Sequence, residues 1–527
     1  MTFWLYCYLA IGAISVASLG VLCSISMLGI LQQSGYSEVV FTRWYFRRRN
    51  MLSIRYALLS LCTILLVTLF DLSFSFLGAT WANLISAVPY LATGIFFYFT
   101  SKRALKVPLK RTGRVVRLAV CYFVLLFATA FGLGIGFSFA ARAVDTNLAY
   151  VFRYVPITVL PIFYPLVLIV AAFCMRAFEM PRNRRFISKA KKTLNASGCI
   201  KVGITGSFAK TSVKHIAAAI LSSKYRVIAT PASYNTPIGI ARTVNDKGAD
   251  CDIFLAEMGA RKEGDIKELC EMVRPDFGVI TGICPQHLET FGSLAAIQRE
   301  KSVLARFSGK GCVLGASAVG LAEGFAAGKD FEAEDVVCTE NGTTFTLRLK
   351  DERVELQTKL LGKHSAEDIA LAGALCYLLG MTAEEIKAGT ERIRPIPHRL
   401  EKIDGNGVNV LDDSYNSNVE GAKDAVYTLR LFGGRKYVVT PGLVELGQIE
   451  VKENEALGEL LAGLDGVILV GETLVLAVRE GYLKAGGEEG KLRIVPTLER
   501  AQQILAEELQ AGDSVLFLND LPDIYNR

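Results

Sequence analysis

Residues 203–212, with the sequence GITGSFAKTS, carry the side chains best suited to chemistry in this chain. An apolar, strand-like run precedes them and a helical pattern follows, which is the setting of a phosphate-binding loop. In such a loop backbone N–H groups surround the phosphates, Lys210 reaches the β- and γ-phosphate oxygens, and Thr211 holds Mg²⁺ at a helix N-terminus. The strict pattern G-x-x-x-x-G-K-[ST] fails at Ile204 and Ala209. The loop by itself therefore leaves open both nucleotide binding and a plain strand-turn-helix with a surface lysine.

The composition of the chain divides it into a membrane part and a soluble part. With 51% hydrophobic residues among 527 and a mean hydropathy of +0.34, the chain is too apolar for a wholly soluble protein. Through Lys192 there are 21 Lys and Arg against 4 Asp and Glu, a balance of +17, and the remainder carries −10. This split argues against nucleic acid as a partner. The twelve cysteines include no C-x-x-C pair, which indicates a reduced, cytosolic environment without a disulfide framework.

Five apolar stretches predict an N-terminal α-helical membrane bundle. The first holds about 29 residues without a charge, too many for the core of a signal peptide. Asp71 lies within the second stretch; it is either a functional carboxylate or, near the outer end, one that reaches headgroup water. Pro156, Pro161 and Pro165 are expected to kink the fifth, because each removes a backbone donor. The predicted spans cover residues 3–31, 56–77, 84–99, 118–140 and 155–175.

The charges of the connecting loops predict the orientation of these spans. The first loop, the third loop and the segment after the fifth span are rich in Arg and Lys, which places them in the cytoplasm. The second loop has no charge and the fourth has few, which places both outside. We therefore expect a multi-pass protein of the cytoplasmic membrane, with its N-terminus outside and its soluble part in the cytoplasm, in contact with ATP.

The soluble part alternates strand and helix patterns from residue 199 onward, which predicts an α/β fold with a parallel sheet covered by helices. Glu257 ends a short buried strand, and the carboxyl end of such a strand faces the ligand crevice. Taken alone, Glu257 is more consistent with a surface carboxylate than with a functional one. His287 lies in the loop after another strand, where it can complete a Mg²⁺ site with Thr211 and Glu257, although Mg²⁺ prefers oxygen ligands.

A series of motifs in this part resembles the Mur ligases, which are ATP-dependent amide ligases of bacterial cell-wall synthesis. The string Asp-Asp-Ser-Tyr-Asn-x-Asn at residues 412–418 is most similar to the member that adds D-alanyl-D-alanine. The resemblance covers about residues 199–527 and none of the first 190. Its motifs, in the order of the family, lie at residues 205–212, 235–239, 256–260, 281–292, 300–301, 362–364, 397–401, 412–418 and 442–447.

The resemblance implies roles for the residues of the central domain, which include the catalytic residues Lys210, His287 and Lys301. Lys210 would bind the β- and γ-phosphates, and Thr211, Glu257 and His287 would ligate Mg²⁺. Lys301 matches a lysine that is carbamylated in many members, which turns an ammonium into a carboxylate-like metal ligand. The ATP-binding loop implied by the family consists of Thr205, Gly206, Ser207, Ala209, Lys210, Thr211 and Ser212.

The resemblance also implies contacts from the last domain. Arg399 would contact ATP and stabilise charge in catalysis, and Asp413 would contact ATP beside it. Tyr415, Asn416 and Asn418 match the nucleotide-side loop that closes with that domain.

Amide synthesis is the implied reaction, with ATP and Mg²⁺ as cofactors. An acceptor carboxylate attacks the γ-phosphate to give an acyl phosphate and ADP, and an amine then displaces phosphate. Domain closure would exclude water that hydrolyses the acyl phosphate. The implied partners are a small amine or dipeptide such as D-alanyl-D-alanine, a muropeptide-like acceptor, the lipid bilayer and other cell-wall enzymes.

Departures from the family pattern raise two questions. Ala209 stands where the family has glycine, at a cost of about 1 kcal/mol if the position needs a positive φ. The two asparagines usual after His364 are missing, which puts adenine contacts there in doubt.

The membrane spans replace the first domain of the family, which holds the UDP-sugar. We therefore expect a lipid-linked or membrane-delivered acceptor whose phosphate groups contact the basic loops. Two alternatives are a membrane-bound synthase of an amino-acid polymer such as poly-γ-glutamate, and a catalytically weakened scaffold that recruits cell-wall enzymes. The predicted domains are a transmembrane domain at 1–178, a basic cytoplasmic linker at 179–198, an ATP-binding central domain at 199–395 and a smaller α/β domain at 396–527.

Overall fold

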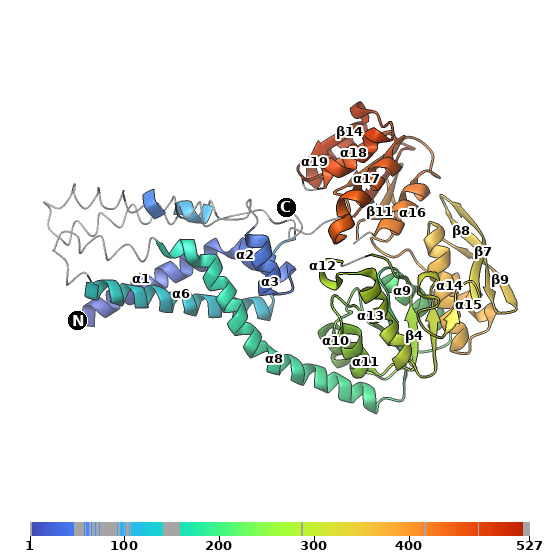
Figure 1. The fold of residues 1–527 in the computed structure, drawn as a ribbon, viewed down its shortest axis with the longest axis horizontal. Coiled ribbons are helices and arrows are strands. Elements are labelled where there is room, and N and C mark those ends of the chain that lie inside the picture. The colour runs from blue at the N-terminus through green and yellow to red at the C-terminus, as the bar shows by residue number, and fades with distance from the viewer. Residues whose placement is uncertain are drawn as a thin grey trace. The chain divides into compact units, whose positions relative to one another are not determined.

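The computed structural model divides the chain into two compact units, Met1–Arg182 and Asn183–Leu521 (Figure 1). The structure describes all residues of the chain except 1–2, 47–56, 58–59, 63–64, 66–68, 70–72, 74–91, 93–94, 100, 102–104, 106, 141–158, 286–287, 416–417, 473 and 520–527.

Apolar helices pack against one another in the first unit through small and aromatic side chains. Ala17, Leu126 and Leu168 are fully buried in this core. Gly20 lets two helices approach closely, because a Cβ atom there would lie 2.6 Å from Leu126 and 3.0 Å from the ring of Tyr164. The helices of this unit are α1 (Phe3–Cys23), α2 (Ile25–Gln33), α3 (Glu38–Tyr45), α6 (Gly113–Ala140), the 3-10 helix η2 (Leu160–Phe163) and α8 (Tyr164–Ala196).

The first predicted span is broken at Ser24. The helical segments on its two sides, Leu9–Cys23 and Ile25–Gln33, are bent by 50°. The hydroxyl of Ser24 forms a hydrogen bond of 2.9 Å with the hydroxyl of Tyr122, which in turn donates to the carbonyl of Tyr164 at 3.1 Å. A polar residue in the apolar core thus has its partners on other helices, a contact that a one-dimensional hydropathy pattern does not contain.

Two helices in the described part of the chain are long and apolar enough to cross a membrane, Gly113–Phe139 and Leu160–Ala196. The bent pair at Ser24 makes a third if it counts as one span. The structure thus supports two or three of the five predicted spans. The predicted spans at 56–77 and 84–99, together with Asp71, lie largely or wholly outside the described residues.

Two of the three prolines expected to kink the fifth span are described. Pro161 lies in the first turn of η2 and Pro165 is the second residue of α8. In a first turn the missing N–H has no helical partner to lose, so a proline there can start a helix without the loss of a hydrogen bond. Pro181 is the proline inside α8, at the boundary of the two units. Pro156 lies outside the description.

The segment predicted as a basic linker is helical, because it forms the last part of α8. Ala190 and Leu194 are buried in a core with Ile240 and Val244. The side-chain amide of Asn245 donates to the carbonyl of Phe186 at 3.1 Å. The C-terminal turns of α8 are therefore part of the second unit rather than a free connection.

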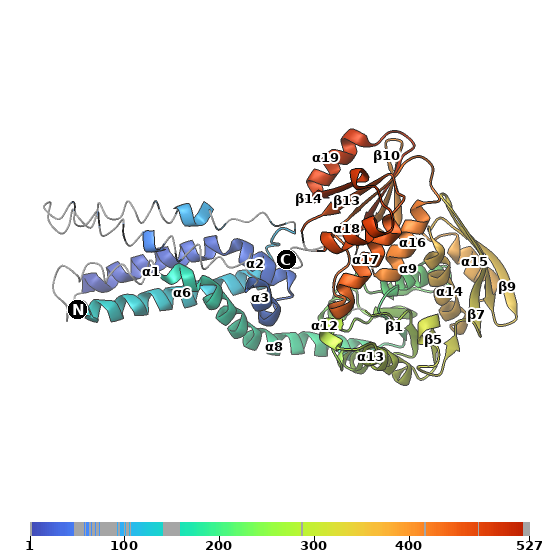
Figure 2. The same ribbon diagram turned by 45° about the horizontal axis from the view of Figure 1, so that its top comes forward.

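The second unit contains a six-stranded parallel sheet, as predicted, in the order β2-β3-β1-β4-β5-β6 (Figure 2). All five residues of β3 are buried, which is typical of a parallel strand with helices on both faces. We call this part, with its helices, the middle domain. Its strands are β1 (Ile200–Thr205), β2 (Val227–Ala229), β3 (Ile253–Glu257), β4 (Phe277–Ile280), β5 (Gly311–Leu314) and β6 (Phe325–Ala326). Its helices are α9 (Lys210–Leu221), α10 (Pro237–Lys247), α11 (Asp265–Val273), α12 (Leu288–Phe291), α13 (Leu294–Phe307), the 3-10 helix η3 (Ala316–Ala318), α14 (Lys363–Leu378) and α15 (Ala383–Thr390).

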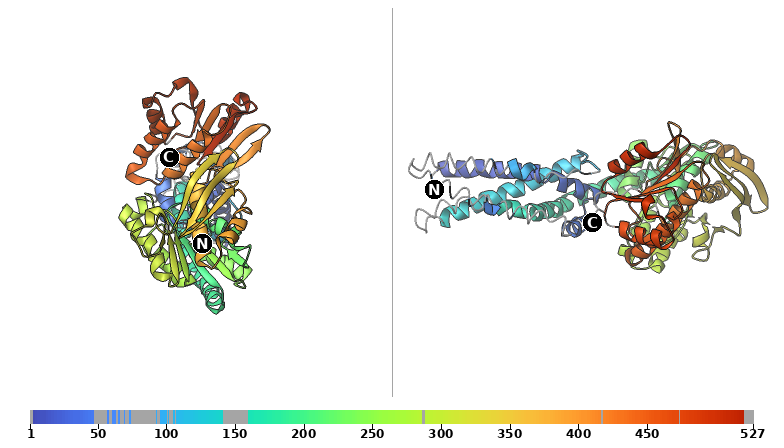
Figure 3. Two further views of the ribbon diagram at one scale, coloured as in Figure 1. Left: turned by 90° about the vertical axis from the view of Figure 1, so that its right-hand side faces the viewer. Right: turned by 90° about the horizontal axis from the view of Figure 1, so that it is seen from above.

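A separate three-stranded antiparallel sheet, not predicted from the sequence, belongs to the same domain (Figure 3, yellow strands). Its strands are β7 (Phe331–Thr339), β8 (Gly342–Leu349) and β9 (Glu352–Thr358). Phe345 and Leu347 face the core that also contains Ile369 of α14. The sheet therefore supports α14.

The C-terminal domain is a second α/β layer, as predicted, with the order β10-β11-β15-β12-β13-β14. All of its strands are parallel except β10, which pairs antiparallel with β11 at the edge. Its strands are β10 (Glu401–Gly405), β11 (Val408–Asp413), β12 (Lys436–Thr440), β13 (Gly466–Val470), β14 (Leu492–Val495) and β15 (Ser514–Leu518). Its helices are α16 (Val419–Leu429), η4 (Gly447–Ile449), α17 (Glu450–Leu461), α18 (Val475–Lys484), η5 (Glu489–Lys491) and α19 (Leu498–Glu508).

Candidate functional site

The phosphate-loop candidate connects β1 to α9, as the sequence predicts. Thr205 ends the strand and Lys210 begins the helix. Gly206 has no room for a side chain, since a Cβ atom there would lie 2.1 Å from the hydroxyl oxygen of Thr281. The backbone N–H of Ser207 donates to the carbonyl of Gly282 at 2.6 Å, which fixes the loop against the segment after β4.

Ala209 adopts the left-handed conformation that the sequence raised as a question, with φ +64° and ψ −9°. An alanine in this region costs about 1 kcal/mol. The hydroxyl of Thr281 donates to the carbonyl of Phe208, next to the strained residue. The loop therefore keeps a glycine-like conformation without glycine, because the segment after β4 holds it in place.

Lys210 lies folded over the loop. Its ammonium group donates to the carbonyls of Gly206 and Ser207, at 2.7 Å each. Burial lowers the pKa of Lys210 to about 8, while Glu257 acts in the opposite direction and Arg399 in the same direction as burial. A bound phosphate would offer this cation a stronger partner than two carbonyls.

Glu257 is the centre of a buried polar cluster at the carboxyl end of β3. Strand β1 pairs with β3 in the register Ile204 to Glu257, which brings the carboxylate beside the loop. One carboxylate oxygen accepts from the hydroxyl of Thr211 at 3.0 Å and from the ammonium of Lys214 at 2.9 Å. The other accepts from the side-chain amide of Asn235 at 3.1 Å. The structure thus brings together Thr211 and Glu257, which the sequence analysis paired as metal ligands.

Lys214 is a member of this cluster that the sequence analysis did not identify. Its side chain is fully buried, pairs with Glu257 and also donates to the carbonyl of Ala232. Burial lowers the pKa of Lys214, and the charge and hydrogen bond of Glu257 oppose that shift. The spacing in the sequence offered a clue, since Lys214 follows Lys210 by four residues and lies on the same face of α9.

The oxygen atoms at this point fit a hard cation such as Mg²⁺. A hydroxyl and a carboxylate, 3.0 Å apart at a helix N-terminus beside a phosphate loop, are the donor types that Mg²⁺ prefers. No group of three or more His, Cys, Asp and Glu residues with metal-site geometry exists among the described residues. His287, the third predicted ligand, lies outside them.

Lys301 lies buried on α13, with only 3% of its surface exposed. Burial and the charge of Lys210 lower its pKa to about 7, against the opposing charges of Glu300 and Asp265. Its amine is therefore substantially neutral near pH 7, which is the form that reacts with carbon dioxide. Its neighbour Glu300 has a different function, since its carboxylate accepts from the backbone N–H groups of Gly264 and Ile266 at the start of α11.

Asp368 lies in the stretch after His364 that lacks the two asparagines usual in the family. It is buried on α14, near Ser212 at the start of α9. Burial raises the pKa of Asp368 to about 7, while the charges of His364 and Arg399 oppose this shift. A buried carboxyl group of α14 therefore lies close to the phosphate-loop helix.

The C-terminal domain contributes Arg399 and Tyr415. The guanidinium of Arg399 lies 4.7 Å from the centre of the Tyr415 ring. The hydroxyl of Tyr415 forms a hydrogen bond with that of Ser233, in the loop after β2 of the middle domain. Asp413 accepts from the backbone N–H of Leu400 at 3.2 Å. These contacts link the loop that follows β11 to the middle domain.

Asn418 has a structural function in this arrangement. Its side-chain oxygen accepts from the N–H groups of Glu420 and Gly421, at 3.1 Å each, so that it caps α16. Its predicted contact with a nucleotide is not tested by this structure. Asn416, the neighbouring predicted residue, lies outside the description.

Comparison with known protein families matches both domains of the second unit. The Mur ligase middle domain matches residues 204–376, and the Mur ligase, glutamate ligase domain matches residues 398–519. Together these matches cover more than half of the chain.

Curated relatives carry the name UDP-N-acetylmuramoyl-tripeptide--D-alanyl-D-alanine ligase. That of Escherichia coli (strain K12) is 32% identical over 292 residues, which are 51% of this chain and 64% of the relative. That of Bacillus subtilis (strain 168) is 28% identical over 344 residues, which are 62% of this chain and 74% of the relative. The matched region thus spans a little under two thirds of the Escherichia coli protein.

Solved structures share the fold. MurF from Acinetobacter baumannii superposes with a TM-score of 0.58 at 23% identity, covering 64% of this chain and 77% of that one. MurF ligase from Thermotoga maritima in complex with ADP gives a TM-score of 0.59 at 24% identity, covering 65% and 81%. With its loop, its sheet order and both domain matches, this chain belongs to the Mur ligase family.

Proposed function

We propose that this protein is an ATP-dependent amide ligase of bacterial cell-envelope synthesis that adds D-alanyl-D-alanine, or a related amine, to a muropeptide-like acceptor. The observation that carries the proposal is the pairing of Thr211 with Glu257, 3.0 Å apart, at the loop that holds Lys210. The 32% identity to a D-alanyl-D-alanine ligase supports the choice of amine.

The proposed reaction has two steps. A carboxylate oxygen of the acceptor attacks the γ-phosphorus of ATP, the bond to the β,γ-bridging oxygen breaks, and an acyl phosphate and ADP form. The amine nitrogen then attacks the acyl carbon, loses a proton and displaces inorganic phosphate. In the first step Lys210 and Arg399 stabilise the charge that develops on the transferred phosphoryl group.

Thr211 and Glu257 are the described residues that would hold Mg²⁺, and we propose His287 and a carbamylated Lys301 as its further ligands. When bound, the ion would neutralise charge on the phosphates. The buried amine of Lys301, with its pKa lowered to about 7, supports carbamylation, since only the unprotonated amine reacts with carbon dioxide. The contact of Tyr415 with Ser233 supports closure of the C-terminal loop over the nucleotide.

We further propose that the protein is a multi-pass protein of the cytoplasmic membrane, with five spans, its N-terminus outside and its ligase domains in the cytoplasm. Two long apolar helices and the broken pair at Ser24 support membrane insertion. The charge balance of +17 through Lys192 supports the orientation. A lipid-linked acceptor follows from this location, since its phosphate groups would meet basic loops.

The test uses the full chain in lipid nanodiscs with ATP, D-alanyl-D-alanine and either UDP-linked or lipid-linked muropeptide. The expected result is amine-dependent phosphate release, with a product heavier than the acceptor by one D-alanyl-D-alanine less one water. Faster release with the UDP-linked acceptor would refute the lipid-linked acceptor alone. Repeated addition to one acceptor would indicate a polymer synthase, and no product with any amine would refute the ligase.

A further inference from the structure

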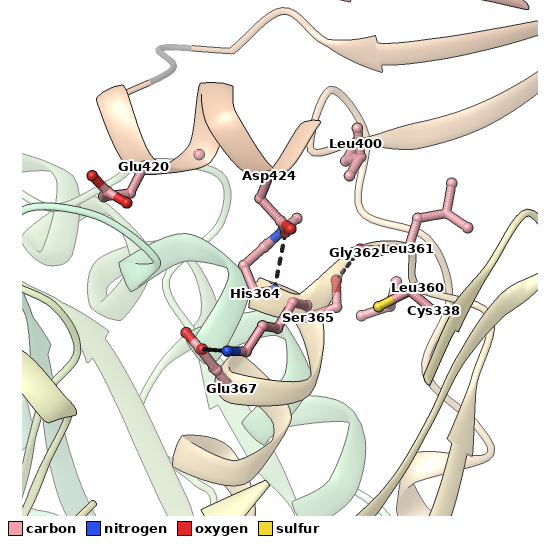
Figure 4. A network of polar contacts seen from close by, with 12 residues as sticks. Cys338, Leu360, Leu361, Gly362, His364, Ser365, Glu367, Leu400, Glu420 and Asp424 are labelled. Carbon is pink, nitrogen blue, oxygen red and sulfur yellow. Dashed lines mark hydrogen bonds and ion pairs between the residues drawn. The ribbon is translucent and has the colours of Figure 1, made fainter. Parts of the chain in front are cut away.

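The middle and C-terminal domains meet at a contact between α14 and α16. In Figure 4, Asp424 projects from α16 toward His364 at the start of α14. One oxygen of Asp424 accepts from the backbone N–H of His364 at 3.0 Å and also bonds to the ring nitrogen Nδ1 of that residue. One carboxylate thus engages two donors on the other domain, a backbone N–H and a ring nitrogen.

The N-terminus of α14 needs a partner from elsewhere. Its N-cap residue is Gly362, which has no side chain to accept from the first N–H groups of the helix. A Cβ atom at Gly362 would lie 2.7 Å from the carboxylate oxygen of Asp424. The space beside the glycine is therefore filled by an acid from the C-terminal domain, in the position where the helix dipole favours negative charge.

The charges around this contact make it an ion pair near neutral pH. Burial alone lowers the pKa of His364, but the hydrogen bond and charge of Asp424, together with Asp368 and Asp413, raise it to about 9. Burial raises the pKa of Asp424, but the hydrogen bond and the charge of His364 lower it by more, so the net shift of this pKa is downward. The other charged groups facing the pair are Lys363 and Glu367 of α14.

Both helices in this contact lead to the proposed nucleotide site. On α14, Asp368 lies near Ser212 at the start of the phosphate-loop helix. On the other side, α16 follows the loop that contains Tyr415, directly after β11, whose last residue is Asp413. The pair His364–Asp424 therefore joins the half of the site that holds the phosphates to the half that carries Arg399.

We propose that Asp424 is a positioning residue, which caps α14 across the domain boundary and thereby sets the C-terminal loop against the phosphate loop for ATP binding. This inference rests on the proposed function for its kinetic consequence. Its structural part, the cap itself, can be measured without any substrate.

The first test is hydrogen exchange of the full chain in nanodiscs, with Asp424→Asn and Asp424→Ala. Loss of the cap should speed exchange of the amide of His364 by about tenfold or more, because its bond to a charged acceptor is lost. Glu420→Gln is the matched control, since Glu420 lies on the same helix and pairs with Lys423 at the surface. Unchanged exchange at this amide in Asp424→Ala, with a folded protein, would overturn the proposal.

The second test separates positioning from simple stability. With the ligase assay, Asp424→Asn should raise the KM for ATP about tenfold and leave kcat nearly unchanged, since the residue touches no reacting atom. His364→Asn should raise KM by less, because the backbone N–H of residue 364 keeps its carboxylate partner. The double variant should match Asp424→Asn, because loss of the carboxylate already removes both contacts. A loss confined to kcat, or additive effects, would contradict the assignment.

The pH dependence gives a third readout. The cap is complete below the ordinary pKa of histidine and weakens as the pH rises through about 9, the pKa of His364 in the folded protein. Lys210, with its pKa of about 8, affects ATP binding in every variant, so the difference between wild type and Asp424→Asn is the quantity measured. This difference should shrink above pH 9. If no acceptor is modified in the ligase assay, the proposed function is refuted. The hydrogen-exchange data still show whether Asp424 caps α14.

Discussion

Buried polar groups differ in kind between the helical unit and the middle domain. In the core of the helical unit, the hydroxyls of Ser24, Tyr122 and Tyr164 bond to one another and to backbone carbonyls, while the buried carboxylate of Glu179, toward the end of that unit, pairs with Arg117. Around the phosphate loop they are full charges, such as Lys214 and Glu257, whose side chains are 0% and 1% exposed. A neutral hydroxyl at a break in a helix is satisfied by another hydroxyl or a carbonyl, whereas a buried charge needs a partner of opposite sign.

This difference shows which part of the molecule tolerates buried charge. In the part of the chain that the structure describes, the buried cations Lys214 and Lys301 lie in one neighbourhood of the middle domain, and the pKa values of Lys210 and Lys301 are lowered there to about 8 and about 7. Such perturbed groups gather where a protein binds charged substrates. Four predictions test this contrast, and each changes a residue in one of the two regions.

Lys214→Met should have the largest effect on stability, a loss of about 3–5 kcal/mol, because it leaves Glu257 buried without its cation. Urea unfolding of the full chain in detergent measures it. Lys224→Met is the matched control, since the pair Lys224–Glu385 is more than one third exposed on both sides and is worth less than about 1 kcal/mol. Equal losses in the two variants would show that buried and exposed pairs do not differ here.

Lys210→Ala should lower ATP turnover by about 10²–10³-fold, because a cation directed at developing phosphoryl charge is lost. Phosphate release measures the rate, and circular dichroism checks that the fold is kept. Lys224→Ala, at a lysine just beyond the end of the same helix, should leave turnover unchanged. Full turnover in Lys210→Ala would defeat the enzyme and favour the scaffold that the sequence left open.

Ala209→Gly should stabilise the protein by up to about 1 kcal/mol, because glycine adopts φ +64° without the steric cost of a Cβ atom. The urea midpoint measures the gain. Ala218→Gly, in the interior of the same helix, should instead destabilise by about 1 kcal/mol. A loss in both variants would mean that the loop does not hold alanine under strain.

Tyr122→Phe should cost about 1 kcal/mol in the helical unit, since it removes the bonds to Ser24 and Tyr164 without a change in shape. Unfolding in mixed detergent micelles measures it. Tyr6→Phe, at an exposed tyrosine of α1, is the control with no expected change. A cost as large as that of Lys214→Met would remove the contrast between hydroxyls and charges.

Local patterns were enough for much of the ligase fold. The apolar run before Gly206 and the helical pattern after Lys210 predicted a strand, loop and helix, and the structure confirms each of them. The positions of Thr211 and Glu257 at one edge of a parallel sheet also followed, because carboxyl ends of such strands lie together. In the membrane part, hydropathy located α6 and α8 but not the break at Ser24.

The phosphate loop, the α/β domains and the family could be predicted from the sequence, because they depend on short stretches whose residue types and spacing are local. The sequence also raised the question of whether position 209 needs a positive φ, because that question concerns the backbone of a single residue. Tertiary structure alone decided that Lys214 neutralises Glu257 and that Asp424 caps α14, 60 residues away along the chain from His364. Such pairs join side chains from different elements, so they exist only once the sheet register and the packing of the helices bring those elements together.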